Sequence, residues 1–349
     1  MKGIVICLVL VTLSTSIGNT GKIFSNPNPE NKIFIITLDG FRWEEVFKGA
    51  DPSLISDEKS TADSSFTKAL YWDEDEKERR KKLLPFFWNV VARQGELYGN
   101  RNYGNFVNVS NPYALSYPGY NELLTGKVDY SIYDNKKRKN TNKNILHLLN
   151  KTPEYKGKVA AFTSWDAFPY ILDKGDKDGF VLNSGFQKLD GQKLSSSQNA
   201  LNSLQGKMDH TPTRYDELTF IACKEYVTRN KPSVVFLSFS GTDNAGHERR
   251  YDQYLQEANN ADRMIGELWR LLQTMPEYAG KTTFLITTDH GRGKTKSTWA
   301  NHGFFVPGSS QTWYALLGNK IVPHGEMKNN TQVYQKDLNS LVMDILARD

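Results

Sequence analysis

The stretch IFIITL at residues 33–38, followed at once by Asp39 and Gly40, sets the fold class of this chain of 349 residues. Its apolar residues run continuously, which is typical of a strand covered on both faces, as in a parallel sheet. Three further runs have the same character, namely VAAFT at 159–163, VVFLSF at 234–239 and TFLITT at 283–288. Helical patterns at 83–93 and 256–274 lie between them. The alternation predicts an α/β three-layer sandwich, with a mostly parallel central sheet and helices on both faces.

The composition is that of one large globular domain. The chain is 38% hydrophobic and 24% charged, which is ordinary for a soluble fold with a sizeable core. Residues 57–82 are rich in charge and read as an exposed helix or loop, whereas residues about 175–214 are rich in Ser, Asn, Gln, Gly and Lys. We therefore expect a single catalytic domain at 19–349, with a small cap insertion at about 175–214.

The N-terminus has the layout of a secretory signal peptide. Lys2 gives a positive start, residues 3–13 are almost all apolar, and residues 14–18 turn small and polar. The apolar run is too short for a membrane-spanning helix. The sequence thus predicts a signal peptide at 1–18 and an exported protein, periplasmic or secreted, with no membrane span after its removal. Cys223 is then the only cysteine left, so no internal disulfide is possible.

The charge balance argues against a nucleic-acid polymer as partner. The formal net charge is +5, and the basic residues are not gathered into a long stripe. The densest basic run, residues 136–139 (KKRK), sits in a polar stretch and is typical of a solvated loop. Steering of an anionic substrate by this run is the alternative.

Acidic and imidazole side chains follow the predicted strands where each strand ends. The carboxyl ends of parallel strands meet at one edge of a sheet, which is where α/β proteins bind ligands. Aspartate together with histidine suits zinc or another divalent first-row metal better than calcium, which prefers oxygen alone. Each residue alone is more simply a turn or surface residue, but their shared position favours a metal site. The candidates are Asp39, Asp243, His247, Asp289, His290 and His302.

A serine between the first two strands is the candidate nucleophile. The segment from Asn111 to Gly126 (NPYALSYPGYNELLTG) reads as a loop that enters a short helix ending at Gly126. Ser116 falls near the start of that helix, and Pro118 suits its first turn. Free N–H groups at a helix start stabilise an anion. Without the metal candidates, Ser116 would be read simply as a helix cap.

The order of these residues resembles the alkaline phosphatase superfamily, and within it the type I phosphodiesterase/nucleotide pyrophosphatase branch. The resemblance covers roughly residues 31–347. ITLDGFRW at 36–43 is similar to the metal-binding opening of that branch. SYPGY at 116–120 and LLTG at 123–126 are similar to its nucleophile segment. That nucleophile is most often threonine, so Ser116 is a departure that keeps the hydroxyl.

The resemblance implies an enzyme that hydrolyses small-molecule phosphate esters with two divalent metal ions. Asp39, Ser116, Asp289 and His290 would hold one ion. The other would be held by Asp243, His247 and His302. The hydroxyl of Ser116 would attack phosphorus to form a phosphoseryl intermediate, which water then hydrolyses.

Other members of the superfamily remain alternatives. A sulfatase would need arginine where Tyr120 stands and paired aspartates where Asp39 is followed by Gly40. A phosphate monoesterase, a mutase or a phosphonate-cleaving enzyme would share the metal core. A non-catalytic binding protein for phosphate esters is the alternative from another class, and the complete set of metal-site residues argues against it.

Two kinds of residue are candidates for contact with substrate. Asn135 lies beyond the nucleophile helix, where the phosphodiesterase branch carries an asparagine that hydrogen-bonds a phosphate oxygen; its other reading is a polar loop residue. An aromatic platform for a base or aryl group is the second feature, although aromatic residues after strands are more often part of the core. The candidates for it are Phe41, Trp43, Tyr120 and Trp165.

Overall fold

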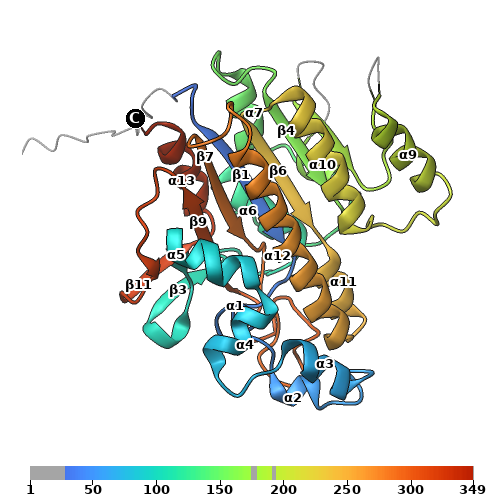
Figure 1. Cartoon of the computed structure of the whole chain (residues 1–349), viewed down its shortest axis with the longest axis vertical. Coiled ribbons are helices and arrows are strands. Elements are labelled where there is room, and N and C mark those ends of the chain that lie inside the picture. The colour runs from blue at the N-terminus through green and yellow to red at the C-terminus, as the bar shows by residue number, and fades with distance from the viewer. Residues whose placement is uncertain (1–27, 174–178, 191–193, 349) are drawn as a thin grey trace, which may run out of the picture.

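A computed structural model describes residues 28–173, 179–190 and 194–348 (Figure 1). The predicted signal peptide at 1–18 lies outside the described residues, and so do residues 174–178 and 191–193 of the predicted cap.

An eight-stranded sheet forms the centre of the molecule, with the order β10-β2-β9-β7-β1-β6-β4-β5. The run from β7 to β5 is parallel throughout, whereas β9 pairs antiparallel with both β7 and β2. The four predicted apolar runs form β1, β4, β6 and β7. The strands of this sheet are β1 Lys32–Leu38, β2 Gly95–Tyr98, β4 Val159–Thr163, β5 Val181–Ser184, β6 Val234–Phe239, β7 Thr282–Thr287, β9 Tyr314–Gly318 and β10 Gly325–Glu326.

A small second sheet has the order β11-β3-β8 and is built from β3 Asn105–Asn108, β8 Gln311–Thr312 and β11 Thr331–Tyr334. The α-helices are α1 Trp43–Lys48, α2 Pro52–Ile55, α3 Ser64–Tyr71, α4 Glu76–Leu83, α5 Ala92–Gln94, α6 Ser116–Thr125, α7 Ile145–Lys151, α8 Phe168–Ile171, α9 Ser196–Gln205, α10 Asp216–Asn230, α11 Gly241–His247, α12 Tyr251–Gln273 and α13 Asp337–Leu346.

Helices cover both faces of the central sheet. Successive side chains of a strand point to opposite faces, and those of β1 alternate between two hydrophobic cores. Phe34 and Ile36 pack in the core that includes α10 and α12, which cross in front of the sheet in Figure 1. Ile33 and Ile35 pack in the core that includes α6, α7 and α13. This arrangement confirms the predicted three-layer α/β sandwich with a mostly parallel sheet.

The predicted helices are present with shifted bounds. The pattern at 256–274 belongs to α12, Tyr251–Gln273. The pattern at 83–93 covers the end of α4, a π-helical turn at Phe87–Val91 and α5. The charged stretch 57–82 contains α3 and most of α4, which lie together with α2 at one end of the molecule (Figure 1).

The described residues of the predicted cap form one strand of the central sheet and one helix beside it. Val181–Ser184 form β5, which pairs parallel with β4 at the edge of the central sheet. Ser196–Gln205 form α9, which packs against α10. Pro212 and Thr213, at the end of the stretch, reach the cavity described below.

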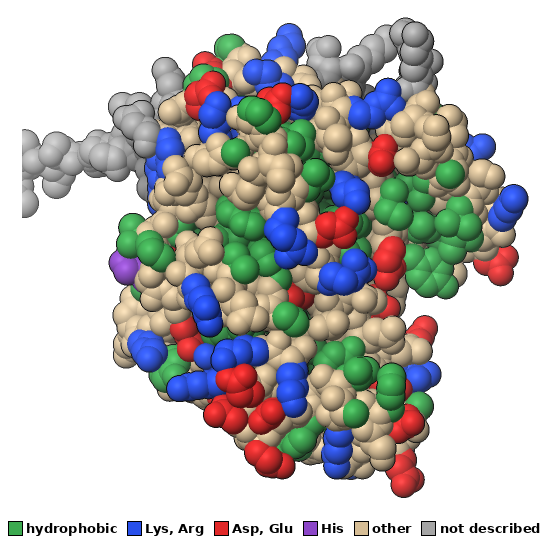
Figure 2. Space-filling view, in the orientation of Figure 1, with side chains coloured by type: hydrophobic (Ala, Val, Ile, Leu, Met, Phe, Trp, Pro, Cys, Tyr) green, Lys and Arg blue, Asp and Glu red, His purple; other side chains and the backbone are tan. Residues whose placement is uncertain are grey.

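The basic run at 136–139 is neutralised locally. Lys137 pairs with Asp166 at 2.7 Å, and Lys139 pairs with Asp173 at 2.9 Å. Lysine and arginine side chains are mixed with acidic ones over the face seen in Figure 2. Within the described ranges, none of the helices combines the length and the apolar character that a bilayer crossing requires.

Candidate metal and nucleophile site

The candidate ligands meet at the carboxyl edge of the parallel strands. β1 lies between β6 and β7 and runs parallel to both, so the ends of all three strands point the same way. Asp39 follows β1, α11 with Asp243 and His247 follows β6, and Asp289 follows β7. The juxtaposition predicted from the strand ends is therefore present.

Asp39, Asp289 and His290 form a first, fully buried cluster. The Nε2 atom of His290 lies 3.4 Å from Asp39 Oδ1 and 3.5 Å from Asp289 Oδ2. The hydroxyl oxygen of Ser116 lies 3.2 Å from the same nitrogen. Three oxygens and one nitrogen from four side chains thus face a common point.

The hydrogen bonding of this cluster fits a bound divalent metal. Asp39 Oδ1 and Asp289 Oδ2 are buried and accept no hydrogen bond, whereas buried oxygens normally have a partner. The other oxygen of each carboxylate is held in place, because Asp39 Oδ2 accepts from the Tyr120 hydroxyl and Asp289 Oδ1 accepts from the Gly40 N–H. His290 Nδ1 lies 2.9 Å from the Gly291 carbonyl oxygen, which leaves the Nε2 lone pair toward the carboxylates.

Burial dominates the electrostatics of the first cluster. It raises the pKa of Asp289 to about 8, helped by the charge of Asp243. It also raises the pKa of Asp39 well above its usual range, with Asp289 as the next cause. Burial lowers the pKa of His290 well below its usual range, so the imidazole is neutral, as a metal ligand must be. Asp39 and Asp289 form no ion pair with a lysine or arginine among the described residues, and a divalent ion neutralises such carboxylates.

Ser116 is presented to this cluster by the start of α6. It is the first residue of the helix, and Leu115 takes the N-cap position, so the prediction of a serine near the N-cap is confirmed. Gly119 lets the helix approach the segment after β7 closely, because a Cβ at this position would lie 2.4 Å from the Asp289 carbonyl oxygen. The helix ends at Gly126, as expected.

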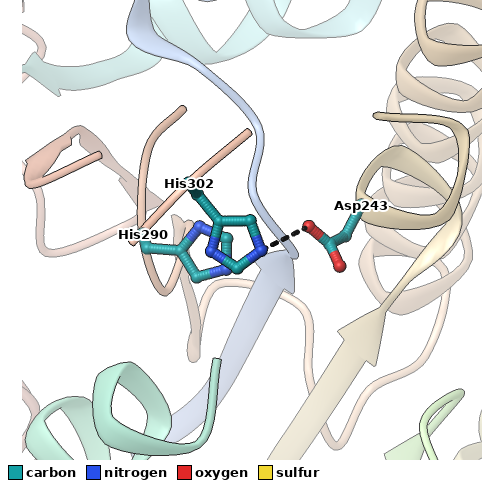
Figure 3. A group of neighbouring side chains, drawn as sticks. All are labelled: Asp243, His290 and His302. Carbon is teal, nitrogen blue, oxygen red and sulfur yellow. Dashed lines mark ion pairs between the residues drawn. The ribbon is translucent and has the colours of Figure 1, made fainter. Parts of the chain in front are cut away.

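Asp243, His247 and His302 form a second cluster beside the first. Asp243 Oδ2 lies 3.1 Å from His247 Nε2, one turn further along α11. His302 Nε2 lies 3.1 Å from His247 Nε2 and 3.8 Å from Asp243 Oδ1. The rings of His302 and His290 stack on each other (Figure 3), and their centroids are 4.0 Å apart, so the two clusters adjoin. Burial lowers the pKa of His302 to about 4.

Arg292 is a part of the site that the sequence analysis missed. Its guanidinium is buried, forms an ion pair with Asp243 and donates to the carbonyl oxygens of Trp299 and Ala300, just before His302. Burial, the largest single effect, would raise the pKa of Asp243, but the Arg292 charge together with the hydrogen bond from His247 and the charge of His302 holds that pKa well below its usual range. Arg292 therefore ties α11 to the segment that carries His302. Its position directly after Asp289-His290-Gly291 was the available signal.

A cavity of about 260 Å³ opens over both clusters. Ser116, Asn135 and Trp165 line it together with Asp39 and ligands of the second cluster. Asn135 Oδ1 accepts the N–H of Tyr117 at the start of α6, and its amide nitrogen has no hydrogen-bond partner among the described residues. The structure thus places Asn135 beside Ser116, as a substrate contact requires.

Of the four aromatic candidates, Trp165 alone lines this cavity. Phe41 and Tyr120 have no exposed surface, and Trp43 is buried in the core. The Tyr120 ring packs against Phe168, and its hydroxyl donates to Asp39 Oδ2 at 3.0 Å. Tyr120 therefore lies beneath a ligand of the first cluster, where it can orient Asp39 but cannot stack on a substrate.

Replacement of Tyr120 by phenylalanine separates these two roles. Loss of the hydroxyl frees Asp39 Oδ2, so we expect affinity for the activating metal to fall about 10- to 100-fold. At saturating metal, KM should stay within about twofold of the original value, because no substrate contact is lost. Metal titration followed by steady-state kinetics measures both quantities. A large rise in KM at unchanged metal affinity would restore the substrate-contact assignment.

A serine at a helix start, facing two adjoining clusters of Asp and His at the edge of a parallel sheet, defines a metal-dependent hydrolase of phosphate esters. The comparisons agree with this class. A family model described as type I phosphodiesterase/nucleotide pyrophosphatase matches residues 56–311, and the chain belongs to this family. The match excludes Asp39, whose assignment rests on the geometry given above. No curated protein sequence matches the chain.

Solved structures of the alkaline phosphatase superfamily share the fold at low sequence identity. The alkaline phosphatase PafA aligns with a TM-score of 0.59 at 10% identity, covering 92% of this chain and 96% of its own. A phosphonate monoester hydrolase from Silicibacter pomeroyi aligns with a TM-score of 0.58 at 12% identity, covering 91% and 74%. Murine ectonucleotide pyrophosphatase/phosphodiesterase 5, an inactive variant in complex with AMP, aligns with a TM-score of 0.52 at 13% identity, covering 90% and 95%.

Proposed function

We propose that this chain is an exported phosphodiesterase that holds two divalent metal ions and acts through a phosphoseryl intermediate on Ser116. The observation that carries the proposal is the convergence of the Ser116 hydroxyl on His290 Nε2, between two buried carboxylate oxygens that lack partners. A hydroxyl held only as a helix cap would have no reason to face such a cluster.

The donor sets fit two ions of the first transition series, with zinc favoured by the mixture of imidazole and carboxylate. Asp39, Ser116, Asp289 and His290 would hold the first ion. The second would be held by Asp243, His247 and His302. Asp243 Oδ2 and His302 Nε2 each lie 3.1 Å from His247 Nε2, and Asp243 Oδ1 lies 3.8 Å from His302 Nε2. When bound, the ions supply Lewis acidity that favours the serine alkoxide and offsets charge on the phosphoryl oxygens.

The side chains and backbone of the site supply positioning. Ser116 Oγ forms a bond to phosphorus while the bond from phosphorus to the leaving alcohol breaks, and the alcohol oxygen takes up a proton from solvent. The free N–H groups at the start of α6 favour the negative charge near Ser116. Asn135 lines the cavity, and its amide nitrogen would donate to a phosphoryl oxygen. Hydrolysis of the phosphoseryl group by water then restores the serine.

The wall of the cavity favours a diester over a monoester. No lysine or arginine lines it among the described residues, so the protein offers no positively charged side chain to a second phosphate charge. A diester carries one negative charge, whereas a monoester carries close to two at neutral pH. We therefore expect the cavity to accommodate the singly charged diester better than the more highly charged monoester.

A comparison of four aryl esters tests this function. With purified, metal-replete protein, the turnover efficiency for an aryl phosphate diester should exceed that for the monoester, the phosphonate and the sulfate ester of the same phenol. The ratio of these efficiencies reports differential binding of the transition states. A monoester that wins by a wide margin would move the protein to another branch of the superfamily. A sulfate ester that wins, or formylglycine at position 116, would establish a sulfatase.

Export has its own test, which does not depend on the chemistry. The proposal rests on the charged start, apolar run and small polar residues of 1–18. Fractionation of the producing cells, followed by N-terminal sequencing, should find a shortened protein outside the cytoplasm. Full-length protein confined to the cytoplasm would contradict it.

A further inference from the structure

Helix α11 supplies two of the three side chains of the second cluster, yet it is short. It contains 7 residues, Gly241–His247, and Asp243 and His247 are the two ligands that it carries. A helix of this length is not stable without contacts to the rest of the protein. The positions of both ligands therefore depend on the side chains that hold α11 in place.

A buried carboxylate holds the first turn of α11. Asp216 Oδ1 accepts the N–H of Ser240 at 2.9 Å, and Asp216 Oδ2 accepts the N–H of Gly241 at 2.8 Å. The N–H groups at the start of a helix have no partner within the helix, so they need one from outside it. Asp216 Oδ1 also accepts the hydroxyl of Ser164, which directly follows β4. The carboxylate thus joins the end of β4 to the start of α11.

The Asp216 side chain serves α11 and not its own helix. Asp216 is the first residue of α10, where an acidic side chain can accept the N–H groups of the same helix. Among the described residues, however, the hydrogen bonds that its carboxylate accepts come from Ser164, Ser240 and Gly241. Burial raises the pKa of Asp216 to about 6, although these hydrogen bonds oppose the rise. At neutral pH the group is therefore mainly a charged acceptor, which forms stronger hydrogen bonds than a neutral one.

The contact between Asp216 and α11 is close. A Cβ at Gly241 would lie 2.8 Å from Asp216 Oδ2, so a side chain at this position would press against the carboxylate. The same turn of α11 also reaches the first cluster, because the Thr242 hydroxyl donates to the Asp39 carbonyl oxygen at 2.6 Å. A shift of this turn would therefore move Asp243 and His247 relative to Asp39.

We propose that Asp216 is a positioning residue, which fixes the start of α11 so that Asp243 and His247 stand in the geometry of a metal site. The inference rests on the proposed two-metal function and names a residue outside both clusters on which the second ion depends. Asp216 does not line the cavity over Ser116, so it contacts neither the ion nor the substrate and acts through α11.

Asp216→Asn tests this role through metal binding alone. Asparagine offers one oxygen where the carboxylate has two, so its amide nitrogen would face the N–H of either Ser240 or Gly241. Equilibrium dialysis against buffered free zinc should find two zinc ions per chain in wild-type protein. In the variant, the affinity for one ion should fall about 10- to 100-fold, as for other residues that orient metal ligands. The affinity for the other ion should stay unchanged.

Two control variants make the result specific to α11. Asp262 is likewise buried and accepts two backbone N–H groups, those of Phe86 and Phe87. Asp262→Asn should lower the midpoint temperature of thermal unfolding and leave both zinc affinities unchanged. His247→Ala removes a ligand of the second cluster, and on this background Asp216→Asn should not change the binding of the remaining ion.

Gly241→Ala displaces the carboxylate without removing it, and it decides the question where Asp216→Asn does not fold. Alanine favours the helix, but its Cβ would press against Asp216 Oδ2, so the affinity for one zinc ion should again fall. Wild-type zinc affinities in Asp216→Asn and Gly241→Ala would overturn the positioning role, and so would an equal loss in Asp262→Asn. Wild-type protein that binds fewer than two zinc ions would overturn the two-metal function, and this inference with it.

Discussion

Replacement of Ser116 by alanine should lower turnover of a phosphate diester by about three orders of magnitude or more, as expected when a covalent nucleophile is lost. The hydroxyl oxygen lies 3.2 Å from His290 Nε2 at the start of a buried helix. The other hydroxyl of this helix at the cluster belongs to Tyr120, which donates to Asp39 Oδ2 and does not line the cavity. The fold should survive, because alanine fits the space of serine and favours the helix. Steady-state kinetics, circular dichroism and metal analysis measure the three properties.

Two further variants make this result specific. Ser116→Thr keeps the hydroxyl and matches the residue most often found in the phosphodiesterase branch, so it should retain most of the activity. Ser131→Ala removes an exposed serine of the loop beyond α6 and should leave turnover unchanged. Near-normal turnover in Ser116→Ala would rule out the serine as nucleophile, and trapping of phosphate on Ser116 after a rapid quench would identify the intermediate directly.

The strands that carry the site were predictable because each is buried on both faces. A continuous apolar run such as 234–239 leaves few alternatives to a central parallel strand. Parallel strands share a carboxyl edge, so the meeting of Asp39 with Asp289 followed from their positions after β1 and β7. The apolar runs and the residues directly after them were therefore enough to predict this part of the site.

The remaining features depend on contacts that sequence patterns do not encode. β2 and β9 extend the sheet antiparallel, and residues 95–98 alternate in burial over too short a length to be distinguished from a loop. Arg292 is charged and follows a glycine, which is typical of an exposed turn, yet its guanidinium is buried against Asp243. Tyr120 was a candidate for an aromatic platform in the substrate site, but the helix turns its ring into the core.

The second large effect concerns Asp289→Asn. Asparagine keeps the shape of the side chain and can still accept a hydrogen bond from the N–H of Gly40. It removes the charged carboxylate oxygen that faces His290 Nε2 and that would bind the metal ion. We expect turnover to fall by about three orders of magnitude, because the proposed mechanism assigns activation of the Ser116 hydroxyl and neutralisation of the phosphoryl oxygens to a metal ion in the first cluster. The metal bound per chain should fall as well, by loss of the ion in the first cluster.

The stability of this variant should change in opposite directions with and without metal. Asp39 and Asp289 are buried near each other and form no ion pair with a lysine or arginine among the described residues, so their charges cost folding free energy in metal-free protein. Asp289→Asn removes one of these charges, and the chelated variant should unfold at a higher temperature than chelated wild-type protein. Metal should then raise the midpoint temperature of thermal unfolding of wild-type protein far more than that of the variant.

Thermal unfolding with and without a chelator measures this reversal in the order of the two midpoints. Asp344→Asn on the exposed side of α13 is the matched control. Equal gains from metal in the variant and in wild-type protein would show that Asp289 is not a ligand.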